Sequence, residues 1–480
     1  MKILLINPTT HFEIVGNNPT ALEESRGFNP PLGLLLLAGY LEKHSDHDVC
    51  ILDALAEQLT FIEIADRIEN YCADVVGITA MTQTMIDVMR IVEIVKARTP
   101  EAKVVLGGPH VHLFPDETIQ LPGVDFLVRG EGEISFHKLL EAMNNLNTLK
   151  EIPGLTFKNG KQIVNTGLPA FIDDLDSLPF PARHLTNVHQ YDSVLSPRNP
   201  TTTIFTSRGC PYVCSFCDRP HLGKKFRARS AKNVVDELED CIRMGIHEFL
   251  VYDDTFTVRK QRVMDICNEI LARNLDVGFD IRARVDTVDK EMLALLAKAG
   301  CRGIHYGIEA GTPKILEVLK KGITIELAQQ VFKDTKEAGM QVLAYFMIGS
   351  PGETRSDIME TFRVSRALDP DFIHLTVLTP FPGTEIYEQG LKDGIFKTDV
   401  WREFARNPNM GFVPPYWPEI FSLDELNAML VQGYKQFYRR PEYLARRLRA
   451  IRTPYELIRK GKAGIRILTM KNKSETKRRF

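Results

Sequence analysis

The sequence of 480 residues has no apolar run of the length that a membrane-spanning helix requires. Such a helix needs about 20 mainly apolar residues, whereas the longest candidate, residues 32–41, is short and interrupted by glycine. The apolar segment within residues 1–8 is too short for a signal peptide and predicts a first strand instead. We therefore expect a cytoplasmic protein, with peripheral contact at the inner membrane face as an open alternative.

Cysteine is scarce as well: the chain has 8, and no second C-x-x-C pair accompanies the one at residues 214–217. A reducing compartment keeps thiols free, so a disulfide framework is not expected in a cytoplasmic chain. Five of the cysteines are isolated in apolar or helical surroundings and are expected to be small core residues: Cys50, Cys72, Cys241, Cys267 and Cys301.

The other three cysteines, Cys210, Cys214 and Cys217, are spaced as C-x-x-x-C-x-x-C and follow an apolar β-type segment, 201–206. Three thiolates on one loop can ligate three irons of a 4Fe–4S cluster, which normally takes four cysteines. The fourth iron is then open to a small chelating ligand. Two other interpretations stay open, namely a zinc site completed by His221 and three unrelated buried thiols.

Residues 1–140 alternate short β-rich apolar runs with amphipathic helical patterns, which favours a doubly wound parallel sheet of Rossmann type. Ligands bind such sheets at the carboxyl ends of the strands. Polar and glycine residues follow three of the predicted strands, although an ordinary sheet connection would use the same glycines: Thr79, Thr82, Gly107, Gly108, Gly130 and Glu131.

The length predicts two or three domains, and the pattern changes twice more along the chain. Residues 141–200 read as a connector with two short strands and a proline-rich passage. From 201 to 385 a βα unit recurs, which predicts a partial (β/α)6 barrel of TIM type with its site where the strands end. Residues 386–480 are predicted to be helical and basic. Four charged residues follow successive barrel strands: Asp253, Asp254, Arg284 and Glu309.

The C-x-x-x-C-x-x-C motif, with Phe216 before its last cysteine, resembles the radical S-adenosylmethionine (SAM) superfamily. The resemblance implies that the open iron takes the amino and carboxylate groups of SAM and that one electron cleaves SAM to a 5'-deoxyadenosyl radical. It also implies that Asp253 or Asp254 accepts from the SAM ammonium, that Arg284 supplies a cation and that Glu309 binds the ribose.

The G-G-P-H and V-R-G-E-G-E motifs, at 107–110 and 128–133, resemble the cobalamin-binding domain that precedes the barrel in one branch of this superfamily. The six residues named above for the first sheet are then the expected cobalamin contacts. The D-x-H-x-x-G motif that supplies an axial histidine in related domains is missing around His11. His110 and His112 are left as alternative cobalt ligands.

The combined resemblance implies an oxygen-sensitive, cobalamin-dependent C-methyltransferase that methylates an unactivated carbon. One alternative is the anaerobic magnesium-protoporphyrin monomethyl ester cyclase, whose carboxyl end carries a similar Y-x-x-F-Y helix, here at 434–438. Another is a non-enzymatic iron–sulfur and corrinoid sensor, although 201–385 has no helix-turn-helix pattern. Expected partners are a small-molecule substrate such as a lipid, terpenoid or tetrapyrrole and a flavodoxin- or ferredoxin-type electron donor, but no nucleic acid.

The carboxyl-terminal tail differs in charge from the rest of the chain. Residues 439–480 contain 15 Lys or Arg and 3 Glu, although the whole chain has a net charge of −2. Basic amphipathic helices are predicted at 434–449 and 454–468. A helix of this kind can be solvated or docked within the chain, can lie on anionic lipid, or can contact nucleic acid.

Overall fold

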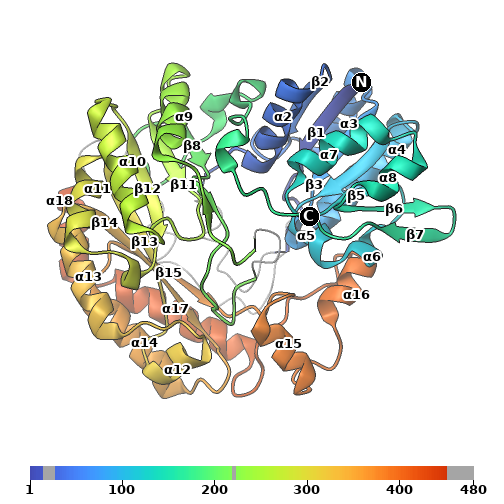
Figure 1. The fold of residues 1–480 in the computed structure, drawn as a ribbon. Helices are drawn as coiled ribbons and strands as arrows, with labels where there is room; N and C mark the ends of the chain where they lie inside the picture. The colour runs from blue at the N-terminus through green and yellow to red at the C-terminus, as the bar shows by residue number, and fades with distance from the viewer. Residues whose placement is uncertain (15–26, 219–222, 451–480) are drawn as a thin grey trace.

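The computed structural model describes residues 1–14, 27–218 and 223–450. Its strands form two large, mainly parallel sheets that lie side by side, each covered by helices, and carboxyl-terminal helices run beneath both (Figure 1). This arrangement confirms the predicted fold class, a Rossmann-like sheet followed by a partial barrel and a helical end.

The first sheet has the strand order β2-β1-β3-β4-β5-β6-β7. Its parallel part consists of β1 (Lys2–Asn7), β2 (Asp48–Asp53), β3 (Val75–Thr79), β4 (Lys103–Gly107) and β5 (Phe126–Val128). Because the order reverses between β1 and β3, their carboxyl ends form the crevice in which doubly wound sheets bind ligands.

Helices cover both faces of this sheet, which explains why its strands are apolar on both sides. Alternate strand residues such as Leu4 and Val76 pack under α3 (Phe61–Tyr71) and α4 (Met85–Arg98). Their neighbours Ile3 and Val75 pack under α2 (Leu32–His44) and α7 (Gly132–Ala142) on the other face.

Two antiparallel strands, β6 (Leu155–Asn159) and β7 (Gln162–Asn165), extend the first sheet beyond β5. Both strands had been expected in the connector. The sheet thus continues past residue 140, and the domain boundary predicted there stays a prediction.

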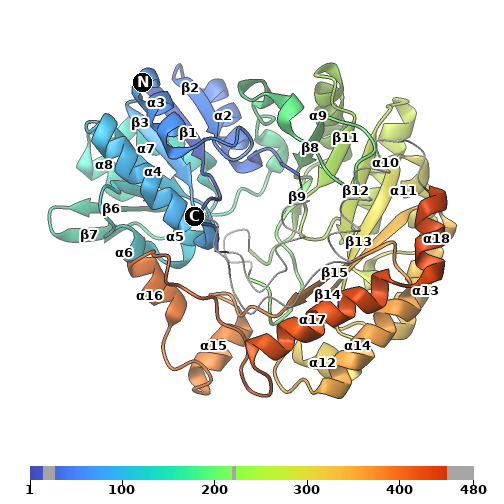
Figure 2. The same cartoon turned by 180° about the vertical axis from the view of Figure 1, so that it is seen from behind.

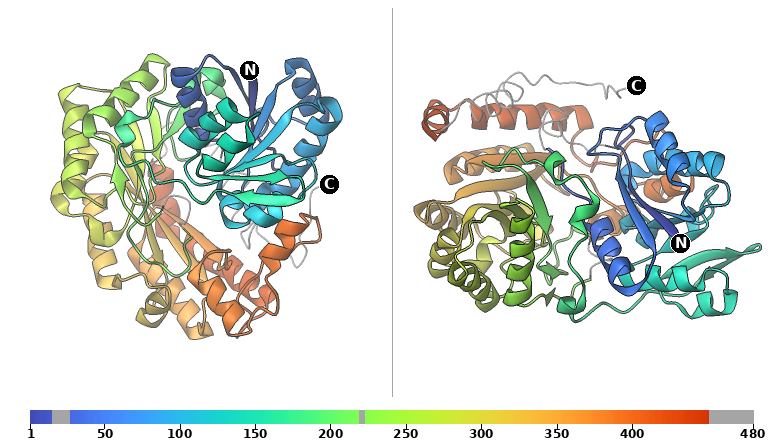
Figure 3. Two further views of the ribbon diagram at one scale, coloured as in Figure 1. Left: turned by 45° about the vertical axis from the view of Figure 1, so that its right-hand side comes forward. Right: turned by 90° about the horizontal axis from the view of Figure 1, so that it is seen from above.

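The second sheet is wholly parallel, in the order β15-β14-β13-β12-β11-β8. Its strands, in chain order, are β8 (Thr201–Ile204), β11 (Glu248–Val251), β12 (Gly278–Ala283), β13 (Cys301–Glu309), β14 (Gln341–Ile348) and β15 (Phe372–Val377). The helices between them cover the outside: α9 (Ala231–Arg243), α10 (Lys260–Ala272), α11 (Lys290–Lys298), α13 (Ile325–Glu337) and α14 (Arg355–Leu368). The views in Figure 3 show these helices around the curved sheet.

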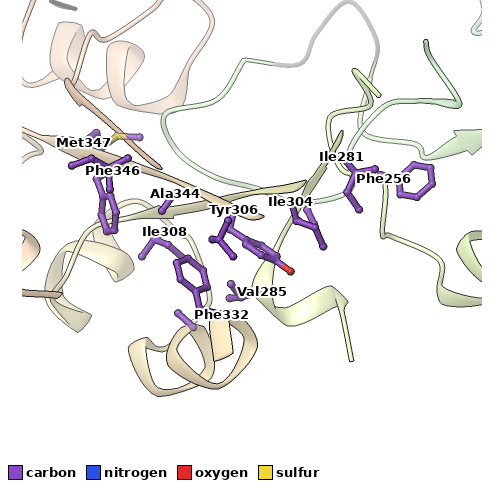
Figure 4. Close-up of a cluster of buried hydrophobic side chains, with 14 of the residues drawn as sticks. Phe256, Ile281, Val285, Ile304, Tyr306, Ile308, Phe332, Ala344, Phe346 and Met347 are labelled. Atoms are coloured by element: carbon purple, nitrogen blue, oxygen red, sulfur yellow. The ribbon is translucent and has the colours of Figure 1, made fainter. Parts of the chain in front are cut away.

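Exposure alternates along the barrel strands, as expected for side chains of period two. Ile281, Ile304, Tyr306 and Phe346 are buried on the helix side, near Phe332 of α13 (Figure 4). The residues between them are half-buried and face the lumen of the barrel. One face of the sheet is therefore apolar and covered by helices, and the other face carries polar side chains that point into the barrel lumen.

The carboxyl-terminal helices contact both sheets (Figure 2). Phe404 of α16 (Val400–Arg406) is part of the core of the first sheet. Arg402 of the same helix donates to Glu117 of α6 (Pro115–Thr118) at 2.5 Å. The next helix, α17 (Leu423–Tyr438), lies along β15. Within the described part of the chain, no helix is both long enough and apolar enough to span a bilayer.

The basic helix predicted over 434–449 is two helices, α17 and α18 (Pro441–Ala450). The segment is helical as predicted, with a break where the Pro441 ring cannot continue an α-helix that begins upstream. Arg440 and Arg446 pair with Asp369, and Arg447 pairs with Asp371. This part of the tail is docked within the chain, while the helix predicted at 454–468 lies outside the described residues.

Candidate functional site

The cysteine segment begins at a short antiparallel pair, β9 (Ser207–Arg208) with β10 (Arg227–Ala228). Gly209 follows in the left-handed region, with φ of +82°, and turns the chain toward Cys210. Cys210 is buried, with its Sγ 3.8 Å from Thr255 Oγ1. Cys214 is half-buried and Cys217 is exposed. The structure thus places the three cysteines on one loop over the carboxyl ends of the barrel strands.

Ser215 fixes the middle of this cysteine loop. Its amide and hydroxyl donate to the carbonyls of Leu319 and Val318, at 3.1 and 2.9 Å, at the end of α12 (Pro313–Val318). Its own carbonyl accepts from Ile386 of α15 (Glu385–Lys392). Phe216 packs against the barrel core. The loop is thereby bound to two helices at the point between Cys214 and Cys217.

Asp253 follows β11 and holds the start of the cysteine loop. Its carboxylate has no exposed surface and accepts four hydrogen bonds, from the amides and hydroxyls of Thr206 and Ser207, at 2.5 to 3.0 Å. Two carboxylate oxygens offer about four acceptor positions, so these bonds use the full capacity of Asp253. Its neighbour Asp254 is exposed.

Arg284, directly after β12, lies beside the loop. Its guanidinium is 3.9 Å from the centre of the Tyr212 ring, and its Nη1 is 3.8 Å from Cys214 Sγ. Two hydrogen bonds to Asp286, at 2.9 and 2.8 Å, fix its orientation. Burial alone would lower the pKa of Arg284, but the bonds to Asp286 raise it. A permanent cation therefore lies next to a cysteine sulfur.

Glu309 ends β13 in the left-handed region, with φ of +73°. Such a conformation costs about 1–3 kcal/mol in a residue with a side chain. Lys321, itself buried, donates to Glu309 Oε1 at 2.9 Å. A Cβ on Gly307 would lie 2.2 Å from that oxygen and 2.7 Å from Lys321 Nζ. Glycine at 307 thus leaves the room in which this buried pair forms.

Glu353 closes the turn after β14. Its Oε2 accepts from the amides of Gly349 and Ser350, at 2.6 and 2.9 Å. Burial raises the pKa of Glu353 to about 7, although the two amide bonds oppose the shift. The turn at the carboxyl end of β14 is therefore stabilised by an acid that is partly protonated near neutral pH.

The donor set of the cysteine loop fits an iron–sulfur cluster better than a single ion. Among the described residues, no three His, Cys, Asp or Glu side chains are gathered closely enough to hold one metal ion. A cubic cluster binds each thiolate at a different corner, so its ligands lie farther apart than those of a tetrahedral zinc. The proposed fourth zinc ligand, His221, lies outside the described residues.

The predicted cobalamin residues lie at the carboxyl ends of β3, β4 and β5, the strands on one side of the switch point of the first sheet. Thr79 ends β3 and Gly107 ends β4, the neighbouring strand. Gly108 has φ of +103°, and a Cβ there would lie 2.9 Å from the carbonyl of Ala80. The absence of a side chain at Gly108 therefore allows the end of β4 to pack directly against the backbone that follows β3.

His110 and Thr82 lie beneath this edge. Thr82 Oγ1 is 3.0 Å from His110 Nδ1, and both side chains are buried. Burial lowers the pKa of His110 to about 3, so the ring is neutral at physiological pH. His112 lies on the same short helix, α5 (Pro109–Leu113).

The V-R-G-E-G-E motif contacts the barrel. Glu131 is bound by Arg208 at 3.1 Å and by Arg227 at 2.8 Å, and Glu133 is bound by Arg208 at 2.5 Å. All four side chains are buried. Glu131, a predicted cobalamin contact, is thus engaged with β9 and β10, while Gly130 before it has φ of +73° beside Pro169.

The sequence interpretation missed both arginines of this group. Arg208 stands two residues before Cys210 and Arg227 lies in β10, so the buried group joins the first sheet to the strand pair that carries the cysteines. No local signal pairs residues so far apart in the chain. A hint was available in the charge of Arg208, which comes two residues after the apolar β-type segment 201–206.

Comparison with known proteins gives two family matches. Residues 204–364 match the radical SAM superfamily, and residues 20–140 match the B12 binding domain. An uncharacterized methyltransferase of Pyrococcus horikoshii, PH0819, is 35% identical over 92% of this chain and 94% of its own length. The anaerobic magnesium-protoporphyrin IX monomethyl ester cyclase of Cereibacter sphaeroides is 29% identical over 91% of this chain and 70% of its own.

Solved structures share the fold. The cobalamin-dependent S-adenosylmethionine radical enzyme OxsB has a TM-score of 0.75 at 17% identity, over 97% of this chain and 71% of that one. The radical S-adenosylmethionine methyltransferase TsrM of Kitasatospora setae has a TM-score of 0.67 at 21% identity, over 82% and 78%.

The fold and the site define a radical SAM enzyme with a cobalamin-binding domain. The chain belongs to the radical SAM superfamily, and within it to the family whose members carry a B12-binding domain ahead of the barrel. Its cofactors are accordingly a 4Fe–4S cluster, SAM and cobalamin.

Proposed function

We propose that the protein is a cobalamin-dependent C-methyltransferase that acts on an unactivated carbon of a small molecule. The observation that carries the proposal is the buried group formed by Arg208, Arg227, Glu131 and Glu133. It fixes the cysteine loop against the domain that matches B12 binding, as a reaction that uses both cofactors requires. The full-length similarity to a protein named as a methyltransferase supports it.

Cys210, Cys214 and Cys217 are proposed to hold the cluster, with Arg284 beside Cys214 and Phe216 packed behind the loop. When bound, the cluster and SAM supply a carbon-centred radical that abstracts hydrogen, and cobalamin supplies a methyl group. Because the start of the cysteine loop occupies all acceptor positions of Asp253, Asp254 is proposed to accept hydrogen bonds from the SAM ammonium. Glu309 is proposed to bind the ribose.

The cobalamin contacts are proposed at Thr79, Thr82, Gly107, Gly108 and Gly130, at the carboxyl ends of the strands, where doubly wound sheets bind their ligands. Glu131 is proposed to act indirectly: its ion pairs with Arg208 and Arg227 hold this edge of the sheet in position against the barrel. The proposed domains are 1–140, 201–385 and 386–480, with 141–200 between the first two.

Lipid, terpenoid and tetrapyrrole substrates are all compatible with the named relatives, which include a hopanoid C-3 methylase of Methylococcus capsulatus. A ring-forming activity is the second candidate, because the cyclase similarity covers most of this chain. The two activities differ in the number of methyl groups transferred per turnover: a methyltransferase transfers one, whereas a cyclase transfers none. A low-potential flavodoxin or ferredoxin is the proposed reductant.

Anaerobic reconstitution with iron, sulfide and cobalamin tests the proposal. With dithionite and SAM, the wild-type protein is expected to form 5'-deoxyadenosine, and Cys→Ala variants at 210, 214 and 217 are expected to lose both the cluster and this product. Cys72→Ala, which removes an exposed cysteine elsewhere, is the matched control. Formation of no 5'-deoxyadenosine by the reconstituted wild type would favour the sensor interpretation.

A further inference from the structure

Five adjacent barrel strands each contribute one side chain to the lumen, at two neighbouring levels, because β13 and β14 pair His305 with Leu343 and Gly307 with Tyr345. Register pairs Arg282 of β12 with His305 of β13, and Tyr345 of β14 with His374 of β15. Tyr252 directly follows β11 and lies under the Arg282 guanidinium, 4.2 Å from ring centre to Cζ. All five are half-buried, unlike the buried residues that alternate with them. We call these residues the lumen belt: Tyr252, Arg282, His305, Tyr345 and His374.

Within the part of the chain that the structure describes, the Arg282 guanidinium makes no hydrogen bond and no ion pair. Asp280 precedes Arg282 by two residues on the same face of β12, and burial raises the pKa of its carboxyl to about 7. The other neighbouring carboxylates are paired with other cations. Asp286 binds Arg284, Glu309 binds Lys321, and Glu248 binds Arg198 and Arg302. A half-buried guanidinium without an anionic partner retains part of its desolvation cost, which a bound anion would compensate.

The rest of the belt offers neutral donors around this cation. The hydroxyl of Tyr252 accepts from the amide of Asn29 at 3.0 Å, which leaves its own proton to donate. Tyr345 and His305 are joined at 3.2 Å between the hydroxyl and Nδ1. Burial, with a contribution from Arg282, lowers the pKa of His305 to about 3, so this ring adds no second positive charge at neutral pH.

We propose that the lumen belt binds an anionic oxygen group of the substrate, a carboxylate or a phosphate, with Arg282 as its cation. Guanidinium matches both groups through paired N–H donors, and the hydroxyls of Tyr252 and Tyr345 complete the site. Arg284, the proposed cofactor-side residue, is two residues further along the chain, directly after β12 and about 7 Å beyond Arg282. The substrate therefore enters with its anionic end first and presents a carbon above the belt. This inference rests on the proposed function, which it extends to a substrate class.

The test uses the full chain, reconstituted with cluster, cobalamin and SAM, and titrates it with inorganic phosphate and, separately, acetate by anaerobic calorimetry. Arg282→Met is expected to weaken anion binding by about tenfold or more, the loss typical of a charge-assisted bond. Arg282→Lys retains the charge and is expected to lie between wild type and Arg282→Met. Arg243→Met is the matched control, since Arg243 is an exposed arginine on the outer helix α9.

A second measurement separates the substrate's anion from the carboxylate of SAM. SAM affinity and uncoupled 5'-deoxyadenosine formation by Arg282→Met are expected to stay within about twofold of wild type. Equal phosphate and acetate binding in wild type and Arg282→Met overturns the inference, as does a loss confined to SAM binding. A wild-type protein that binds phosphate through Arg282 but forms no 5'-deoxyadenosine would refute the proposed function and leave the anion site standing.

Discussion

The hydroxyl of Tyr434 makes both backbone hydrogen bonds of Leu375: it accepts from the amide at 2.7 Å and donates to the carbonyl at 2.9 Å. Tyr438 does the same for Ile373, at 3.1 and 3.2 Å. The spacing is matched, because four residues of helix rise about 6 Å and two residues of strand about 6.6 Å. Since β15 is the last strand of the barrel sheet, α17 satisfies an edge that would otherwise be open.

Replacing Tyr434 with Phe should therefore destabilise the barrel edge. The change leaves the buried amide and carbonyl of Leu375 without partners, at a cost of about 1–3 kcal/mol. We expect faster hydrogen exchange at the Leu375 amide and a lower denaturant midpoint. Tyr416→Phe, at a half-buried tyrosine, is the control. Unchanged exchange at Leu375 would show that the edge is protected in another way.

Removing Arg208 should cost more than a surface ion pair. Arg208→Met leaves Glu133 buried without its cation, which typically costs about 3–5 kcal/mol. Denaturant unfolding of the apoprotein measures the loss. The double variant Arg208→Met/Glu133→Gln removes the stranded charge as well and should recover part of the stability. A double variant no more stable than the single one would contradict this account.

The stability of the turn after β14 should depend on pH through Glu353. Because its pKa rises from 4.5 to about 7 on folding, the folded state holds a proton across this window that the unfolded chain has lost. The free energy of unfolding therefore falls as pH rises through the window, by about 3 kcal/mol at most. Glu353→Gln keeps an oxygen for the two amides and cannot titrate.

Unfolding midpoints at pH 5 and pH 8 measure this effect. The wild type should lose more stability than Glu353→Gln between the two values. Asp280, whose pKa burial also raises to about 7, is present in both proteins and cancels in the difference. Parallel pH profiles would mean that Glu353 is ionised in the folded protein throughout.

Gly307→Ala should weaken SAM binding without unfolding the barrel. The added Cβ displaces Glu309 from Lys321, so the proposed ribose contact is lost. We expect a rise of about tenfold in the SAM dissociation constant, the loss of one hydrogen bond to a charged group. Gly33→Ala is the control, because a Cβ at Gly33 meets nothing within 4 Å. Unaltered SAM affinity would remove Glu309 from the proposed site.

Much of the architecture could be predicted from the sequence because period-two strands alternate with amphipathic helices between glycine and proline signals. The first strand predicted within residues 1–8 is β1, and the two short strands predicted in the connector are β6 and β7. The break before Pro441 could also have been predicted from the sequence, since a proline within a helical pattern ends the helix.

The site was less predictable where distant parts of the chain meet. Asp253 was correctly found at a strand end, but its engagement with Thr206 and Ser207 depends on how the loop folds back. The buried pairing of Glu131 with Arg208 joins positions 77 residues apart. Arg282 looked like any charged residue near a strand end, and only the strand register places it in the lumen.

The buried group of Arg208, Arg227, Glu131 and Glu133 also sets a rule for dividing this chain. A fragment cut near residue 200 would keep both glutamates without their arginines, and its complement would keep the arginines without the glutamates. In each fragment the unpaired charged side chains would be exposed to water, whereas in the whole protein they are buried and paired. Transplanting either half onto a foreign partner therefore requires moving the complementary pair of residues with it.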